Sequence, residues 1–136
     1  MTDVKKIAIV VSEGTFDKGM MAMMIANTAT SMGMEVHVFG TFFGLNLLKK
    51  GYRPKAPGLF RLFTGMFRKK MKAVGVEDYP EQVKMAMDLG VNLYACGTSM
   101  GVMNVKEEDL YPGVKILGAA GFLNIAADSD MQFFIG

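Results

Sequence analysis

Short apolar runs alternate with longer segments of helical periodicity along this chain. Five runs rich in β-branched or aromatic residues predict strands, at residues 5–11, 35–39, 92–96, 115–117 and 131–135. The first run is apolar almost throughout, which is typical of a strand buried on both faces of a parallel sheet.

The segments between these runs predict helices over residues 17–32, 41–50, about 80–90 and 119–127, with a short helix after Gly97. Asp17 suits a helix N-cap and Pro80 a first helical position, while Gly33 suits a helix C-terminal stop. Regular alternation of strand and helix predicts an α/β fold with a mainly parallel five-stranded sheet and helices on both faces. No repeat or linker divides the chain, so residues 1–136 are expected to form a single domain.

The charged residues are unevenly distributed. Nine of the fifteen Lys and Arg residues lie between Glu35 and Glu77, a stretch without acidic residues, whereas the rest of the chain is net negative. No apolar run reaches the ~20 residues of a membrane-spanning helix, and no signal peptide is evident, so the expected location is the cytoplasm. A single cysteine forms no disulfide within the chain, which agrees with a reducing compartment.

Part of the basic stretch, residues 59–71, is also amphipathic. Its apolar positions are Leu59, Phe60, Phe63, Phe67 and Met71. Such a segment suits a lid over its own domain, a subunit interface, or a peripheral membrane contact through Leu59, Phe60, Phe63 and Phe67. The lid or interface interpretation is favoured, and the abundance of apolar helix positions predicts a homo-oligomer.

Cys96 is the strongest candidate for chemistry. It ends a predicted strand, where open α/β sheets place their ligands, and Gly97 allows a sharp turn into the next helix. The N–H groups of that helix, with the Thr98 and Ser99 hydroxyls, are expected to stabilise a thiolate. The alternative is a buried cysteine that acts only as a small apolar residue.

The other candidate residues give weaker signals. His37, the only histidine, lies in the middle of a predicted strand, which favours a structural role over a Cys–His dyad. One Cys and one His are too few for a zinc site, and the fourteen Met residues fit helix faces better than copper ligation, so no metal is predicted. The loop containing Gly14 and Thr15 matches no nucleotide motif, but it opens a helix and suits an anion-binding pocket.

Three segments of the chain resemble the DsrE/DsrF-like sulfur-relay family, and more narrowly its DsrE3-type branch, often labelled peroxiredoxin-like. The first is GTFDKGMMAMMIANTATSMGMEVHVFGTFFGLNLLKK, the second is the cysteine segment LYACGTSMGVMNV, and the third is the ending GFLNIAADSDMQFFIG. Together they cover essentially the whole chain, and the combination around Cys96, Ser99 and Met100 is the most specific part.

This resemblance implies a three-layer α/β/α sandwich, usually oligomeric, in which Cys96 carries sulfur as a persulfide or thiosulfonate-type adduct. It implies a TusA-like sulfur carrier protein and a small sulfur-bearing anion as partners, with no cofactor and no nucleic acid. Because the chain has no second cysteine, a two-cysteine peroxidase cycle is not supported, and a carrier is favoured over an enzyme with multiple turnovers. Two alternatives stay open: a non-catalytic oligomeric binding or assembly subunit that uses the basic Phe-rich segment, and a binder of small anions or nucleotides at the strand ends.

Overall fold

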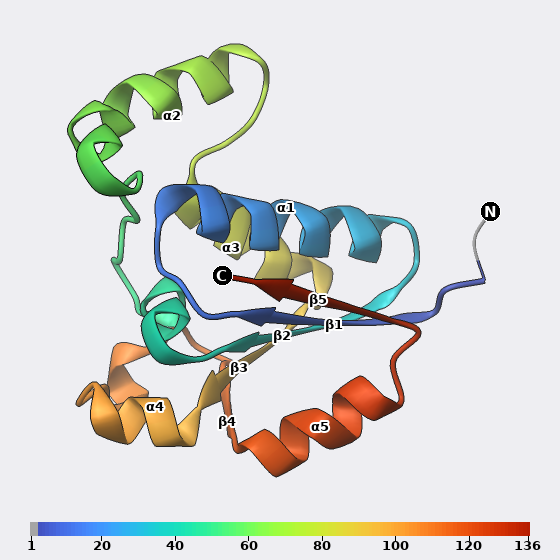
Figure 1. Ribbon diagram of the computed structural model, residues 1–136. Helices are drawn as coiled ribbons and strands as arrows, with labels where there is room; N and C mark the ends of the chain where they lie inside the picture. The colour runs from blue at the N-terminus through green and yellow to red at the C-terminus, as the bar shows by residue number, and fades with distance from the viewer. Residues whose placement is uncertain (1–2) are drawn as a thin grey trace.

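The computed structural model describes residues 3–136 and contains one five-stranded sheet in which every strand is parallel to its neighbours (Figure 1). The strand order is β4-β3-β2-β1-β5. The strands span Lys6–Val11 (β1), Glu35–Gly40 (β2), Asn92–Cys96 (β3), Lys115–Leu117 (β4) and Met131–Ile135 (β5). The predicted fold class is therefore confirmed, and all five predicted strands are present.

The connections between the strands explain how the helices are layered. The chain moves in one direction from β1 to β2 to β3, and right-handed crossovers then place α1 (Phe16–Ser31) and α3 (Tyr79–Leu89) on the same face. The connection from β4 to β5 runs back across the sheet, so α5 (Ala119–Ala127) covers the opposite face. Figure 1 shows α1 and α3 on one side of the sheet and α5 on the other. The short helix α4 (Gly97–Val102) follows the end of β3, and its buried Met100 belongs to the same core cluster as residues of α1 and α3.

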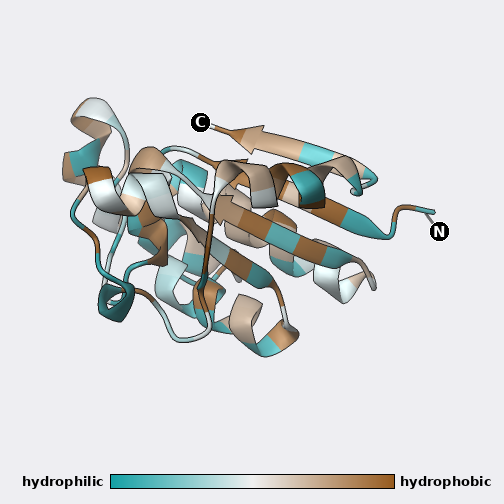
Figure 2. Cartoon of the chain, turned by 90° about the horizontal axis from the view of Figure 1, so that it is seen from below, coloured by the Kyte–Doolittle hydropathy of each residue, from teal (hydrophilic) through white to brown (hydrophobic). Residues whose placement is uncertain are grey.

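The core divides along these two faces. The larger cluster joins β1, β2 and β3 to α1 and α3, and includes Ile9, Met23 and Val83. The smaller cluster lies against α5 and contains Ala8, Phe39, Tyr94, Cys96 and Phe122. Figure 2 shows apolar residues recurring along the strands, as expected for a sheet covered on both faces.

The predicted helix over residues 41–50 is wrong in type, because the structure has a 3-10 helix, η1, at Phe42–Leu48. Phe42 begins it with a positive φ of 49°, and Gly44 packs so close to the end of β1 that an added Cβ would collide with the Val11 carbonyl oxygen. This close approach forces a tight turn where the sequence periodicity alone suggests a regular helix. A further 3-10 turn, η3, spans Glu107–Asp109.

The basic amphipathic segment folds as η2 (Gly58–Phe63) followed by α2 (Thr64–Ala73), and the pair stands apart from the sheet (Figure 1). The contacts that hold it include two hydrogen bonds: the Thr64 hydroxyl accepts the Ala56 N–H at 2.9 Å, and Arg68 donates to the Pro54 carbonyl at 2.7 Å. Arg68 also forms an ion pair with Asp78, at 3.3 Å. A cavity of about 610 Å³ lies between this segment and α1, lined by residues that include Met20, Phe67 and Met71. Across residues 3–136, no helix combines the length and apolar character needed to cross a membrane.

Candidate functional site

Cys96 is the last residue of β3 and the N-cap of α4. Its neighbour Ala95 is fully buried, and the Cys96 side chain is itself 7% exposed. Gly97 begins α4 directly, where a Cβ would lie 3.4 Å from the Ile116 side chain of β4. The expected strand-end position of Cys96 is confirmed, but the helix begins two or three residues earlier than a Thr98 or Ser99 cap would require.

Polar groups from two strand ends surround the sulfur. The buried Ser99 hydroxyl lies 3.1 Å from the Thr41 hydroxyl and accepts the Phe42 N–H at 2.8 Å. Thr41 follows β2, the strand that pairs with β3, so the ends of two adjacent strands meet here. Each hydroxyl has one proton and either can be the donor in the Thr41–Ser99 hydrogen bond, so the hydroxyl that accepts in this pair is the one free to donate to the sulfur.

These groups set the acidity of the thiol. Burial raises the pKa of Cys96, but hydrogen bonding from Ser99, from the Thr41 hydroxyl and from the Thr98 N–H outweighs burial, so the pKa lies below its ordinary value. The site favours the thiolate, which is the nucleophilic form of cysteine.

The predicted site residues fall into two places. Ser99 acts on Cys96 through both its hydroxyl and its N–H group, whereas Thr98 acts only through its N–H group and its side chain is exposed. Gly14 and Thr15 instead line a separate cavity beside η1. Thr41 was not among the predicted site residues, because the pairing of β2 with β3 that brings it close to Cys96 is a long-range contact.

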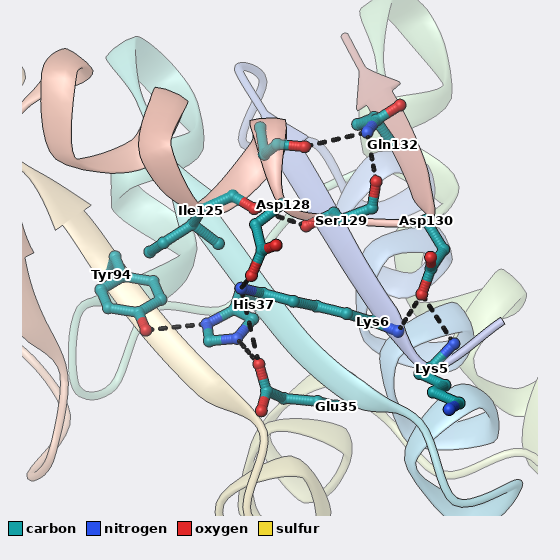
Figure 3. A network of polar contacts seen from close by, with 11 residues as sticks. Lys5, Lys6, Glu35, His37, Tyr94, Ile125, Asp128, Ser129, Asp130 and Gln132 are labelled. Atoms are coloured by element: carbon teal, nitrogen blue, oxygen red, sulfur yellow. Dashed lines mark hydrogen bonds and ion pairs between the residues drawn. The ribbon is translucent and has the colours of Figure 1, made fainter.

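His37 belongs to a polar network on the α5 side of the sheet (Figure 3). Its Nδ1 atom lies 2.8 Å from the Tyr94 hydroxyl, and its Nε2 atom lies 2.6 Å from a Glu35 carboxylate oxygen. The hydrogen bond with His37 is the main cause that lowers the pKa of Glu35. Both ring nitrogens are thus engaged away from the sulfur, and the structure favours the structural role over a Cys–His dyad.

The basic segment does not cover Cys96 in this structure. η2 and α2 lie beside α1, on the opposite side of the sheet from α5 (Figure 1), whereas Cys96 packs in the core cluster on the α5 side. Four large apolar side chains of η2 project into solvent, with Leu59 85% and Leu62 80% exposed, beside Phe60 and Phe63. A lid over the thiol is therefore not its arrangement here, and the segment presents an apolar, basic surface instead.

Together these features define a class of small parallel α/β domains with one cysteine of lowered pKa at the end of a strand. The sequence profile of the DsrE/DsrF/DrsH-like family matches residues 3–60 and 54–134, and the protein belongs to that family. The family prediction is thereby confirmed, while membership of the narrower DsrE3-type branch stays a prediction.

Individual relatives support this assignment. The chain is 29% identical to the sulfur carrier protein DsrE2 of Allochromatium vinosum, over 96% of this chain and 98% of that protein. It is 32% identical to the uncharacterized protein YrkE of Bacillus subtilis, over 96% and 97% of the two chains.

Solved structures share the fold at low sequence identity. The protein of unknown function MTH1491 from Methanobacterium thermoautotrophicum superposes with a TM-score of 0.69 at 12% identity, covering 95% of this chain and 98% of that one. The ychN protein from E. coli superposes with a TM-score of 0.65 at 12% identity, covering 96% and 99%.

Proposed function

We propose that this protein is a sulfur carrier that holds sulfur on Cys96 and passes it to a thiol of a partner protein. The observation that carries the proposal is the lowered pKa of a cysteine at a strand end, with Ser99 and Thr41 directed at its sulfur. The similarity to a sulfur carrier protein over nearly the whole chain supports it.

The proposed transfer consists of two nucleophilic displacements at sulfur. The Cys96 thiolate attacks the outer sulfur of a persulfide donor, R–S–SH; the new S–S bond forms at Cys96 and the donor leaves as R–S⁻. A donor of the type R–S–S–SO₃⁻, attacked at the sulfur next to the sulfonate, leaves a thiosulfonate-type adduct on Cys96 in the same way. A partner thiolate then attacks the carried sulfur and Cys96 leaves as the thiolate, so each step conserves electrons.

Release needs a thiol from another molecule, because Cys96 is the only cysteine in the chain. The protein is therefore proposed to wait in its loaded form for a TusA-like carrier protein or a related acceptor, in the cytoplasm. A small sulfur-bearing anion is the alternative donor, and the homo-oligomeric state expected from the sequence belongs to the same proposal.

Intact-mass analysis after incubation with a persulfide donor tests this function. The wild-type protein is expected to gain the mass of one or more sulfur atoms, removable by dithiothreitol, and Cys96→Ser is expected to gain none. Thermal unfolding of Cys96→Ser checks that the variant is folded. Absence of a reducible adduct on the wild-type protein, with persulfide, thiosulfate and a loaded carrier protein each tried as donor, would refute sulfur loading.

A second function is favoured by one specific observation, the exposed apolar side chains of η2 beside the lysines of α2. We infer that this surface engages a partner or an anionic membrane, as in an assembly subunit. Co-sedimentation with vesicles of anionic lipid distinguishes membrane binding from binding to a protein partner. Loss of binding in a Leu59→Ser/Leu62→Ser variant and at high salt is expected for a membrane contact, and no vesicle binding by the wild-type protein would exclude that use.

A further inference from the structure

A cavity of about 420 Å³ lies away from the thiol, between the loop after β1, η1 and the start of the basic segment. Gly14 and Thr15 form one side of it, Phe43 and Asn46 another, and residues 52–61 close the rest. A cavity of this size holds a small organic molecule rather than a single inorganic ion.

The side chains around this cavity are strongly biased in charge. Arg53, Lys55 and Arg61 line it, and none of its lining residues is acidic. Arg53 is shared with Asp78, to which it donates at 2.8 Å, whereas among residues 3–136 Lys55 and Arg61 form no ion pair. Two positive charges are thus left uncompensated at the edge of one concave site.

The walls of the cavity are fixed by contacts within the fold. The Tyr52 hydroxyl donates to the Gly14 carbonyl at 2.7 Å, and the Phe16 N–H donates to the Lys55 carbonyl at 2.8 Å. The second contact holds the cationic segment against the first turn of α1, which no side chain caps. In that turn the Asp17 carboxylate accepts from the Thr15 hydroxyl at 2.6 Å and offsets the positive end of the helix, so the charge bias of the cavity comes from its cationic side chains.

The cavity also has an apolar wall. Phe43, which is 65% exposed, and Pro57 both line the cavity. The side-chain oxygen of Asn46 accepts from Lys49 Nζ at 3.4 Å, and among residues 3–136 the amide nitrogen of the Asn46 side chain has no hydrogen-bond partner. An aromatic surface, amide donors and unpaired cations together suit a ligand with one apolar part and one anionic group.

We propose that this cavity binds a small organic anion, with a phosphate or sulfonate group on Lys55 and Arg61 and an apolar part against Phe43. The proposal does not depend on sulfur chemistry at Cys96. The two sites share one loop, however: Phe43 lines the cavity and Thr41 faces the thiol. A bound anion would therefore contact the segment that supports the thiolate.

Titration calorimetry with phenyl phosphate, inorganic phosphate and benzyl alcohol tests the proposal at constant ionic strength. Phenyl phosphate is expected to bind more tightly than either of the others, because only it offers both parts. Lys55→Gln and Arg61→Gln are each expected to weaken binding about 5-fold, the effect of one partly exposed charged contact. Lys70→Gln, which removes the same charge from the exposed surface of α2, is the matched control and is expected to change the affinity less than 2-fold.

Amide shifts in NMR spectra locate the ligand. They are expected at Gly14, Thr15 and Gly58, and Cys96→Ser is expected to bind phenyl phosphate like the wild-type protein. No binding of phenyl phosphate, equal binding of benzyl alcohol, or equal losses in Lys70→Gln and Lys55→Gln would each overturn the proposal. Because Cys96→Ser retains this cavity, failure of anion binding can be distinguished from failure of sulfur loading on Cys96.

Discussion

Replacing Ser99 with alanine tests whether the site stabilises the Cys96 thiolate. Ser99 heads the groups that lower the pKa of this thiol, and its side chain is buried. Loss of one hydrogen bond is worth about 1 kcal/mol, which corresponds to about 5-fold less thiolate at a pH below the pKa. The remaining thiolate is more basic and attacks faster, by about 2-fold for a Brønsted coefficient near 0.45.

The two effects predict a crossing of rate profiles. Well below the pKa of the wild-type thiol, reaction of Ser99→Ala with iodoacetamide should be about 2.5-fold slower than that of the wild-type protein, and above the higher pKa of the variant thiol it should be about 2-fold faster. The measurement is the rate of carbamidomethylation of Cys96 as a function of pH. Ser99→Ala also leaves the Phe42 N–H without its acceptor, so unfolding curves must show that the variant is folded at the assay temperature.

Thr98→Ala is the matched control for this experiment. Thr98 acts on the sulfur through its backbone N–H group, and alanine retains that group. The pH profile of Thr98→Ala should therefore coincide with that of the wild-type protein. Identical profiles for Ser99→Ala and wild type, or an equal change in Thr98→Ala, would refute the role given to the Ser99 hydroxyl.

Two further predictions concern the frame that holds the site. Gly44→Ala should lower the free energy of unfolding by about 3 kcal/mol, because its Cβ would collide with the Val11 carbonyl. Gly65→Ala is the control, since Gly65 lies in α2 with open space around it, and it should be neutral or raise the free energy of unfolding by up to about 1 kcal/mol. Urea titration measures both changes. Burial raises the pKa of Asp78, but bonds from Arg53 and the Tyr79 N–H and the charge of Arg68 outweigh it, so the pKa lies below its ordinary value of 3.8. The stability that this carboxylate contributes is present above the ordinary value and is lost as the pH falls through the lower folded-state value. Asp78→Asn keeps a helix cap and should lose about 1 kcal/mol near pH 7. The difference should shrink as the pH falls below 3.8 and vanish below the folded-state pKa; a difference that persists there would contradict the ionic origin.

The sequence carried enough information for the strands and for the position of Cys96. Five apolar runs and the glycine after the cysteine identify them, because burial on both faces and tight strand-end turns leave local signals. The contribution of Thr41 could not be found in this way. It arises because β2 pairs with β3, a long-range register that places residue 41 near residue 96.

The irregular segments show the same limit. Residues 41–50 carry helical spacing, yet the close packing of Gly44 on Val11 imposes a 3-10 turn. The amphipathic pattern of residues 59–71 suggested a buried face, but η2 leaves its apolar side chains exposed. Amphipathic periodicity shows that a segment has an apolar side and does not show what lies against it.

The position of β5 has a consequence for synthesis of the chain. β1 forms the middle of the sheet together with β2, but its other edge pairs only with β5, where Ile7 lies opposite Met131. On the ribosome, β1 is made early, and the backbone N–H and C=O groups along its β5-facing edge stay unpaired until residues 131–135 have emerged. A ribosome stalled before that point holds a nascent chain with an open template for cross-pairing, so premature termination late in the message should yield aggregates rather than a shortened domain.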